Sequence, residues 1–300
     1  MNQQPVTTRC GFVAVIGAPN AGKSTLVNAL TGTKVSIVSH KVQTTRSRIR
    51  AIAVEGGAQI VFVDTPGIFA PRRALDRAMV TAAWAALDEA DMALLMVDAR
   101  AGIGEDVSAL IARLGKVRTP VVLVLNKIDL IERSKLLALS QVLNDRTKFA
   151  ATFMISALSG DGIVDLASYA FAAMPQGPWL YPGDQVADFP MRFLAAELTR
   201  EQVFHQLHDE LPYASTVETE SWREMKDGSV RIDQVIFVER ESQRRIVLGE
   251  KGQTIKSIGK AAREAMAEAF GHKVHLFLFV KVRKNWSADP ERLRMMGLVP

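Results

Sequence analysis

The segment Gly17-Ala18-Pro19-Asn20-Ala21-Gly22-Lys23-Ser24 decides the fold of the first half of this 300-residue chain. It matches the pattern Gly-x-x-x-x-Gly-Lys-Ser/Thr without a mismatch, between a strand expected over Phe12–Ile16 and a helix expected over Lys23–Leu30. Glycines allow such a loop to wrap closely around phosphate oxygens, with successive N–H groups pointing inward. The pattern predicts that Lys23 contacts the β- and γ-phosphates of a nucleotide and that Ser24 is a ligand for Mg²⁺.

A second motif, Asp64-Thr65-Pro66-Gly67, follows the strand expected over Gln59–Val63. From this position Asp64 can reach Mg²⁺ through water, and the N–H of Gly67 can meet the γ-phosphate. Motifs at the carboxyl ends of parallel strands converge on the crevice where such sheets bind their ligands. The two segments therefore predict one phosphate and metal site.

The motif Asn126-Lys127-Ile128-Asp129 selects the base. The carboxylate of Asp129 can accept hydrogen bonds from N1 and the 2-amino group of guanine, a pair that adenine cannot offer. Asn126 contacts the base edge or braces the loop, and the stem of Lys127 can lie along the purine face. The central N–H of Ser156-Ala157-Leu158 can donate to the guanine carbonyl. Together these motifs predict a site for GTP and GDP.

Two loops are expected to respond to the γ-phosphate, Thr33–Arg48 as the first switch and Asp64–Met79 as the second. Within Gln43-Thr44-Thr45-Arg46, one hydroxyl is expected to complete the Mg²⁺ shell when the γ-phosphate is present. Thr45 is preferred and Thr44 is the alternative, because spacing cannot choose between neighbours, and both could be ordinary loop threonines. The predicted metal ligands are Ser24, Thr45 and Asp64.

Ile68 follows the Asp64–Gly67 motif, at a position where many GTPases carry a glutamine that orients the attacking water. An aliphatic side chain cannot orient water, so slow intrinsic hydrolysis or help from another group is expected. The amide oxygen of Asn20 could hold K⁺ beside the phosphates and neutralise charge in the transition state. Alternatively, Asn20 only stabilises the loop turn. The predicted catalytic residues are Lys23, Thr45, Asp64, Gly67 and Asn20, and the predicted nucleotide site also includes Ile68.

The first 173 residues alternate short aliphatic runs with longer mixed segments, as parallel α/β domains do. Gly56-Gly57 signals a hairpin, so one edge strand is expected to be antiparallel. Strands are expected over Phe12–Ile16, Ile49–Val54, Gln59–Val63, Met92–Val97, Val121–Leu125 and Thr152–Ile155. Helices are expected over Lys23–Leu30, Leu75–Ala90, Glu105–Leu114, Lys135–Arg146 and Ile163–Ala173.

Met174–Gly183 has three prolines and two glycines in ten residues, which indicates a strap between domains. We therefore predict an α/β domain over 1–173, a linker over 174–185 and a second, α+β domain over 186–300. The tail Ala288–Pro300 looks dispensable and is assigned no role. Elements of the second domain are expected over Met191–Leu207 (helix), Tyr213–Trp222 and Ser229–Glu239 (strands), Thr254–Phe270 (helix) and Lys273–Arg283 (strand).

Gly249-Glu250-Lys251-Gly252 follows the strand-like run Arg244–Leu248 and precedes a helix. A GxxG turn in helical context is the backbone clamp by which KH domains hold RNA, although a chance turn is the alternative. Ile258 is expected in the apolar floor beneath the bases. The predicted RNA contacts are Ile246, Gly249, Glu250, Lys251, Gly252, Ile255, Lys256 and Lys260.

The charge of +5 is unevenly distributed. Val186–Glu239 has 5 Lys and Arg against 11 Asp and Glu, a balance of −6, whereas Arg240–Lys284 has 11 against 4, a balance of +7. Adjacent blocks of opposite sign indicate a focused basic face around the GxxG turn, which suits an RNA partner. A solvated surface whose charges pair with the acidic block is the alternative.

The composition excludes several classes of protein. An apolar content of 48% with 23% charged residues excludes wholesale disorder. Aliphatic runs such as Val121–Leu125 are too short to cross a bilayer, and Met1–Val15 lacks the features of a signal peptide. With Cys10 as the single cysteine, an intramolecular disulfide and a thiolate metal cluster are excluded. A cytosolic protein is expected.

The order GAPNAGKS, QTTR, DTPG, NKID and SAL, followed by IVLGEKGQTIKSIG, resembles the Era family of bacterial GTPases. In this family an α/β P-loop GTPase domain of Ras-like fold precedes a smaller α+β type II KH domain. The resemblance covers nearly the whole chain. It implies recognition of the 3′ end of 16S rRNA and a role in maturing the small (30S) ribosomal subunit. It also implies peripheral association with the inner membrane. The protein itself is expected to be cytoplasmic and monomeric.

Two other functions fit parts of the sequence. A tRNA-modifying or ribosome-linked GTPase could use the same nucleotide site without contacting RNA directly, but the basic GxxG face argues against it. An RNA-binding module with a nonfunctional nucleotide pocket is the second alternative. The intact set Lys23, Ser24, Asp64 and Asp129 argues against that function.

Overall fold

The computed structural model describes residues 8–298 and divides the chain into two compact units. Of the described residues, the first unit comprises 8–36, 45–188 and 296–298, and the second comprises Ile37–Thr44 and Phe189–Met295. Met1–Thr7 of the predicted first domain and Val299–Pro300 of the tail lie outside the described residues. The domain limits at 173 and 186 stay predictions.

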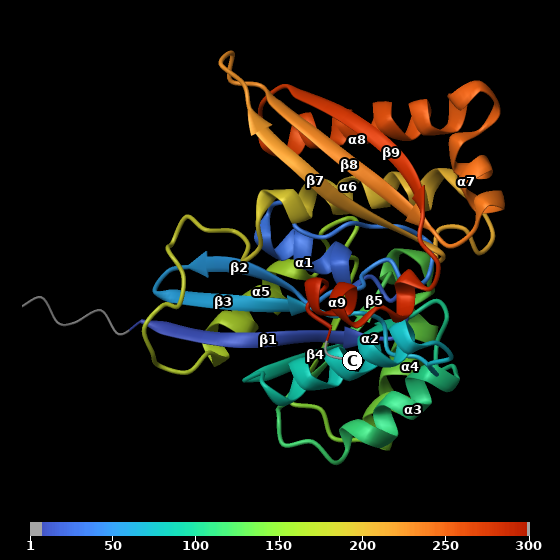
Figure 1. Ribbon diagram of the computed structural model, residues 1–300. Coiled ribbons are helices and arrows are strands. Elements are labelled where there is room, and N and C mark those ends of the chain that lie inside the picture. The colour runs from blue at the N-terminus through green and yellow to red at the C-terminus, as the bar shows by residue number, and fades with distance from the viewer. Residues whose placement is uncertain (1–7, 299–300) are drawn as a thin grey trace, which may run out of the picture. The chain divides into compact units, whose positions relative to one another are not determined.

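A six-stranded sheet forms the centre of the first unit (Figure 1). Its strands lie in the order β2-β3-β1-β4-β5-β6, and only the edge strand β2 is antiparallel to its neighbour. The hairpin predicted at Gly56-Gly57 is confirmed, because it joins β2 to β3. The strands are β1 (Arg9–Gly17), β2 (Ile49–Glu55), β3 (Ala58–Asp64), β4 (Met92–Asp98), β5 (Val121–Asn126) and β6 (Ala151–Ile155).

Five helices of the first unit pack against this sheet or against one another. Three of them share one core cluster with the strands, in which Leu87, Leu110 and Leu143 pack with Leu95 and Leu123. Burial of such aliphatic side chains contributes about 1.5–3 kcal/mol each to folding. The helices are α1 (Lys23–Thr31), α2 (Ala74–Asp88), α3 (Glu105–Leu114), α4 (Arg133–Arg146) and α5 (Ile163–Ala173), with a 3₁₀ turn η1 (Ile128–Leu130) after β5.

The topology brings the predicted motifs to one edge of the sheet. β1 lies between β3 and β4. The chain first adds β2 and β3 on one side of β1 and then adds β4, β5 and β6 on the other side. The loops after β1, β3, β5 and β6 therefore open at the carboxyl end of the sheet, where such folds bind ligands.

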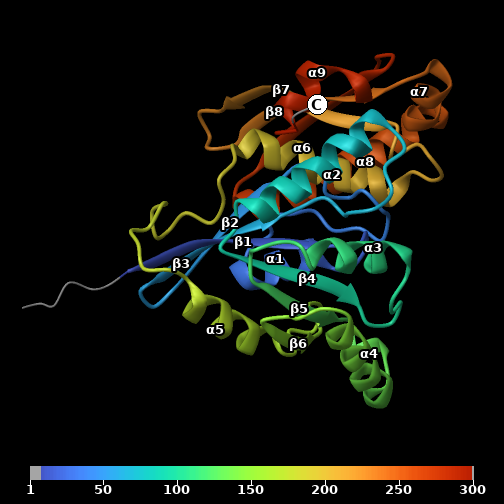
Figure 2. The ribbon, with the colours of Figure 1, turned by 90° about the horizontal axis from the view of Figure 1, so that it is seen from below.

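A three-stranded sheet with two long helices forms the second unit. β8 pairs antiparallel with β7 and parallel with β9, and α6 and α8 lie side by side against the sheet (Figures 1 and 2). This arrangement confirms the predicted α+β class. Its elements are α6 (Met191–Gln206), β7 (Ser215–Glu224), β8 (Val230–Val238), α7 (Glu241–Leu248), η2 (Glu250–Gly252), α8 (Gln253–Phe270), β9 (Val274–Val282), η3 (Trp286–Ala288) and α9 (Pro290–Met295).

The strand-like run predicted at Arg244–Leu248 is wrong, because it belongs to helix α7. Gln243 caps the start of this helix by accepting hydrogen bonds from the N–H groups of Glu239 and Arg240, at 2.9 and 3.1 Å. Val247 is fully buried, whereas Ile246 is 58% exposed, which suits a helix with one face on the core.

The tail is not dispensable in structural terms. The guanidinium of Arg292, in α9, forms an ion pair with Glu218 and lies 4.2 Å from the ring centre of Phe237. Just before the tail, Trp286 is 1% exposed and its indole N–H donates to the carbonyl of Ala214 at 2.9 Å. The carboxyl-terminal segment therefore covers part of the second sheet. Among residues 8–298, no helix has both the length and the apolar character needed to cross a bilayer.

We expect Trp286→Ala to lower the free energy of unfolding of the second unit by about 3–5 kcal/mol, because it empties a buried aromatic site and leaves a carbonyl unpaired. Phe279→Ala is the control, since Phe279 is 52% exposed and its loss should cost below about 1 kcal/mol. Urea unfolding followed by circular dichroism measures both. Equal, small changes would show that Trp286 does not hold the tail in place.

Candidate nucleotide and RNA sites

The phosphate loop runs from Gly17 to Ser24, between β1 and α1. Gly22 has φ +95°, and a Cβ atom there would lie 2.2 Å from Nδ2 of Asn126, so only glycine fits. The ammonium of Lys23 donates to the carbonyls of Gly17 and Ala18, at 3.3 and 3.0 Å. Burial lowers the pKa of Lys23 to about 8, although the nearby carboxylate of Asp64 raises it. The buried ammonium is well placed to meet an anion.

Three oxygen-bearing side chains meet beside this loop. The Ser24 hydroxyl donates to Oδ2 of Asp64 at 2.7 Å and lies 2.8 Å from the hydroxyl of Thr45. Thr45 also donates to Oδ2 of Asp64, at 3.4 Å. Asp64 is fully buried, and its Oδ1 has no hydrogen-bond partner among the described residues. Burial raises the pKa of Asp64, whereas the Ser24 hydroxyl and the Lys23 charge lower it. An oxygen-only donor set with a buried, unpaired carboxylate oxygen fits Mg²⁺.

The geometry separates the two candidate threonines. The hydroxyl of Thr45 faces Ser24 and Asp64, as described above. The hydroxyl of Thr44 instead donates to the carbonyl of Lys41, at 2.7 Å, and lies 2.7 Å from the hydroxyl of Ser39. Thr45 is therefore the threonine that the structure brings to the predicted metal ligands.

The second predicted switch begins against the phosphate loop. The N–H of Ile68 donates to the carbonyl of Gly17 at 3.0 Å, and a Cβ atom on Gly67 would come within 3.0 Å of Pro19. The side chain of Ile68 is 7% exposed and belongs to the core of the first unit. Of the predicted nucleotide contacts, Ile68 can therefore offer its backbone but little of its side chain. Asn20 is exposed and has φ +61°.

The loop after β5 is tied to the loops on both sides of it. Asn126 donates to the carbonyl of Ala21 at 2.8 Å and accepts from the N–H of Ala157 at 2.9 Å, so it braces the loops. The Ala157 N–H predicted for the guanine carbonyl therefore has a different partner in this structure. Asp129 is exposed at the end of the same motif, and Leu158 is 86% exposed.

Sequence reasoning missed Asp98, at the end of β4. Its carboxylate accepts from the ammonium of Lys127 at 2.7 Å, and the same ammonium donates to the carbonyl of Asn20 at 2.7 Å. This pair fixes the stem of Lys127 across the end of the phosphate loop. An aspartate at the carboxyl end of a predicted strand is a signal that could have drawn attention to it.

The GxxG turn of the second unit joins two helices, α7 and α8. Gly249 has φ +71°, and a Cβ atom there would lie 2.2 Å from the hydroxyl of Thr254, so glycine is required. Glu250 and Lys251 at the tip are exposed. Ile255 is partly buried, and the exposed side chains around the turn also include Ile246, Lys256 and Lys260. The tip of the turn thus presents Glu250 and Lys251, with two further ammonium groups exposed along α8.

Ile258 does not belong to the predicted apolar floor. It is fully buried and packs with Val247 and Ile236 in the core of the second unit. Ile255 and Ile258 are three residues apart, so both face the sheet side of α8. Ile258 lies closer to the middle of the helix and is covered completely.

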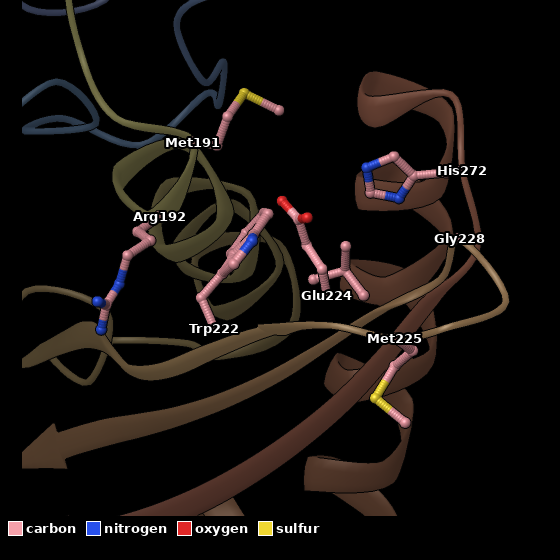
Figure 3. A pocket seen from close by; sticks show the side chains of 8 residues that line it. Met191, Arg192, Trp222, Glu224, Met225, Gly228 and His272 are labelled. Carbon is pink, nitrogen blue, oxygen red and sulfur yellow. The ribbon is translucent and has the colours of Figure 1, made fainter.

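A separate pocket of about 370 Å³ lies near the hairpin between β7 and β8 (Figure 3). Figure 3 shows the carboxylate of Glu224 between the rings of Trp222 and His272. None of the predicted nucleotide or RNA contacts lines it. Its lining residues are Met191, Arg192, Trp222, Glu224, Met225, Gly228, Val230 and His272.

Family models match both parts of the chain. Residues 12–127 match a family described as 50S ribosome-binding GTPase, and residues 210–287 match the KH domain family. The GTPase Era of Afipia carboxidovorans is 64% identical over 296 residues, covering 99% of this chain and 96% of that protein. The chain belongs to the Era GTPase family. The GTPase Era of Brucella suis is 62% identical over 291 residues, covering 97% of this Era-family chain and 94% of that protein.

Solved Era structures share the fold of the whole chain. A variant of Aquifex aeolicus Era bound to GDP·AlF₄⁻ has a TM-score of 0.92 and 36% identity, covering 98% of this chain and 100% of that one. The same values hold for Era in complex with MgGDPNP and nucleotides 1506–1542 of 16S ribosomal RNA. The predicted fold class, a P-loop GTPase domain followed by a KH domain, is confirmed.

Base selection by this Era-family protein can be tested at Asp129. We expect Asp129→Asn to weaken GTP binding by about 100-fold or more, because the charge is lost and the amide NH₂ of asparagine would face one of the two guanine donors. The same variant should bind xanthosine triphosphate more tightly, since the amide offers a donor where xanthine carries an oxygen. Asp145→Asn, an exposed change in α4, is the control. Calorimetric titration with both nucleotides measures the effect, and unchanged base preference would contradict the assignment.

Proposed function

We propose that this Era-family protein is a GTP-hydrolysing switch that binds 16S rRNA near its 3′ end and acts in maturing the small ribosomal subunit. The observation that carries the proposal is the meeting of Lys23, Ser24, Thr45 and Asp64 at one end of the sheet, in a chain that also has a GxxG turn with an exposed tip. Relatives named GTPase Era, and an Era structure that holds part of 16S rRNA, support it.

The phosphate site is assigned to the loop after β1. Lys23 faces the β- and γ-phosphates, where it replaces its bonds to the loop carbonyls by bonds to phosphate oxygens. Ser24, Thr45 and Asp64 would hold Mg²⁺, which supplies positive charge beside the phosphates when bound. The N–H of Gly67 meets the γ-phosphate, so the second switch responds to its presence.

Guanine recognition is assigned to the loops after β5 and β6. Asp129 accepts from N1 and the 2-amino group, and Lys127 lies over the purine face while Asp98 holds its ammonium. Asn126 keeps its role as a brace between the two neighbouring loops. Adenine nucleotides are excluded because they would leave the carboxylate of Asp129 without donors.

RNA binding is assigned to the GxxG turn. The two glycines let a sugar-phosphate chain approach the backbone, and Lys251, Lys256 and Lys260 add positive charge along one side. Ile246 and Ile255 offer apolar contact to the bases. The proposal includes a cytoplasmic, monomeric protein, with peripheral association with the inner membrane by family resemblance.

The RNA assignment is tested by Gly252→Asp. We expect it to weaken binding of a single-stranded oligonucleotide from the 3′ end of 16S rRNA by about tenfold or more, because it places a carboxylate beside the RNA backbone. Gly271→Asp is a matched control, since Gly271 also has positive φ, +69° against +78°, but ends α8 away from the turn. Fluorescence anisotropy gives both affinities. Equal affinities would favour a GTPase that does not contact RNA.

We also propose that Asn20 holds K⁺ beside the phosphates. Such help is needed because Ile68 occupies the position where many GTPases carry a glutamine that orients the attacking water. Replacing K⁺ by Na⁺ should slow GTP turnover several-fold, and Asn20→Ala should remove that difference, because the amide oxygen is the ligand. Asn144→Ala, an exposed change in α4, should retain it. Phosphate release in the two salts measures the rates. Equal rates in K⁺ and Na⁺ for the unmodified protein would leave Asn20 with a structural role only.

A further inference from the structure

The pocket shown in Figure 3 belongs to the second unit alone. Its lining residues come from the start of α6, the end of β7, the hairpin that follows, the first residue of β8 and the turn between α8 and β9. Neither the proposed nucleotide site nor the GxxG turn uses any of them. Its volume of about 370 Å³ is at the lower end of the range for ligand pockets, so it suits one large side chain or a small molecule.

Aromatic contacts hold two walls of this pocket in place. The rings of Trp222 and Phe270 meet edge to face, with their centres 5.7 Å apart. The ring of His272 lies 5.9 Å from the same Phe270 ring. Trp222 also packs against the buried cluster that includes Leu194 of α6. Both rings are therefore fixed by the fold of the second unit.

The carboxylate of Glu224 lies between these two rings and lacks a donor. Figure 3 shows it between Trp222 and His272. Within residues 8–298, no group donates a hydrogen bond to this carboxylate or forms an ion pair with it. Arg192 also lines the pocket, but its guanidinium donates to two carbonyls of β7, both at 3.0 Å. Among the described lining residues, the negative charge is therefore left without a cation.

The aromatic walls favour a cation beside this carboxylate. The face of an aromatic ring carries a negative potential, so it attracts a positive group and disfavours an anion close to it. The unpaired carboxylate of Glu224 between Trp222 and His272 is therefore an incomplete arrangement. A cation in the pocket would meet the carboxylate and the indole ring together.

The charge of the surrounding sequence favours the same kind of ligand. Seven of the eight lining residues belong to Val186–Glu239, the block whose charge balance is −6. Negative charge attracts cations and repels the phosphates of a nucleic acid. This block therefore suits a basic partner, whereas the proposed RNA contacts belong to the basic block Arg240–Lys284.

We propose that the pocket binds an arginine side chain of a partner protein. A guanidinium is planar, stacks on aromatic rings and offers a fork of N–H donors that matches a carboxylate. It would stack on Trp222 and donate to Glu224. Met191 and Met225, which are 45% and 47% exposed, would contact the apolar stem of the arginine. Such binding requires neither GTP nor RNA.

The test follows the indole N–H signal of Trp222 by nuclear magnetic resonance in the full chain, where its loss in Trp222→Leu assigns it. The probe is the peptide acetyl-Gly-Arg-Gly-amide, and the matched peptide carries citrulline, which keeps the shape of arginine without its charge. We expect the arginine peptide to shift the signal saturably with a dissociation constant of about 1–10 mM, as suits a single side chain. The citrulline peptide should bind at least about tenfold more weakly.

The carboxylate is tested by Glu224→Gln, an exposed change that should leave the second unit folded. It should weaken binding of the arginine peptide about tenfold, because the charge is lost while the shape of the side chain is kept. Glu264→Gln, at an exposed position of α8 outside the pocket, is the matched control. Equal affinities of Glu224→Gln and the unmodified protein, equal affinities of the two peptides, or no saturable shift would overturn the inference.

A pocket for nucleobases would give a different result. Single-stranded RNA would then shift the Trp222 signal even in Gly252→Asp, where the GxxG turn is blocked, and would displace the arginine peptide. That outcome would also overturn the inference. We expect RNA to leave the Trp222 signal of Gly252→Asp unchanged, because Glu224 and the acidic block repel phosphates.

Discussion

A buried lysine and a buried aspartate share one pocket in the first unit, and the nucleotide site is organised around them. Lys23 is 6% exposed and Asp64 is fully buried. Removing two such charges from water costs several kcal/mol per ion, and the loop carbonyls and the Ser24 hydroxyl offset only part of it. The same burial lowers the pKa of Lys23 to about 8 and raises that of Asp64. A phosphate at the lysine and a cation at the carboxylate would reverse both shifts, so this pocket gains stability when occupied.

The parts of this site that sequence could predict are those whose constraints are local. Gly22 must be glycine because a Cβ atom would collide with Asn126, and both positions belong to motifs that the sequence displays. The order of strands and motifs then places the loops at one edge of the sheet without further information. The hydroxyl choice at positions 44 and 45 is different, since neighbouring threonines have the same spacing to every motif. Only the backbone direction, which turns Thr44 towards Lys41, separates them.

The features that sequence did not predict depend on partners far along the chain. Arg244–Leu248 is a short run without a readable helical period, and it becomes a helix because Gln243 caps it and Val247 reaches the core. Trp286 is held by the carbonyl of Ala214, 72 residues earlier. The N–H of Ala157 donates to the side-chain oxygen of Asn126, because a buried amide oxygen needs a hydrogen-bond donor. Periodicity and spacing contain no information on such pairings.

Arg200 shows how one buried ion can hold a distant part of the chain within the second unit. Its guanidinium and the Glu197 carboxylate lie on successive turns of α6, so their pairing costs little additional chain entropy. The pair leaves a further donor, and the Thr44 carbonyl, 156 residues away in sequence, accepts from it. If residues 37–44 left α6, that donor would lose its partner in a site where water has little access, at a cost of about 1–3 kcal/mol. A cost of this size favours one arrangement of these residues on α6, and no sequence pattern predicts it.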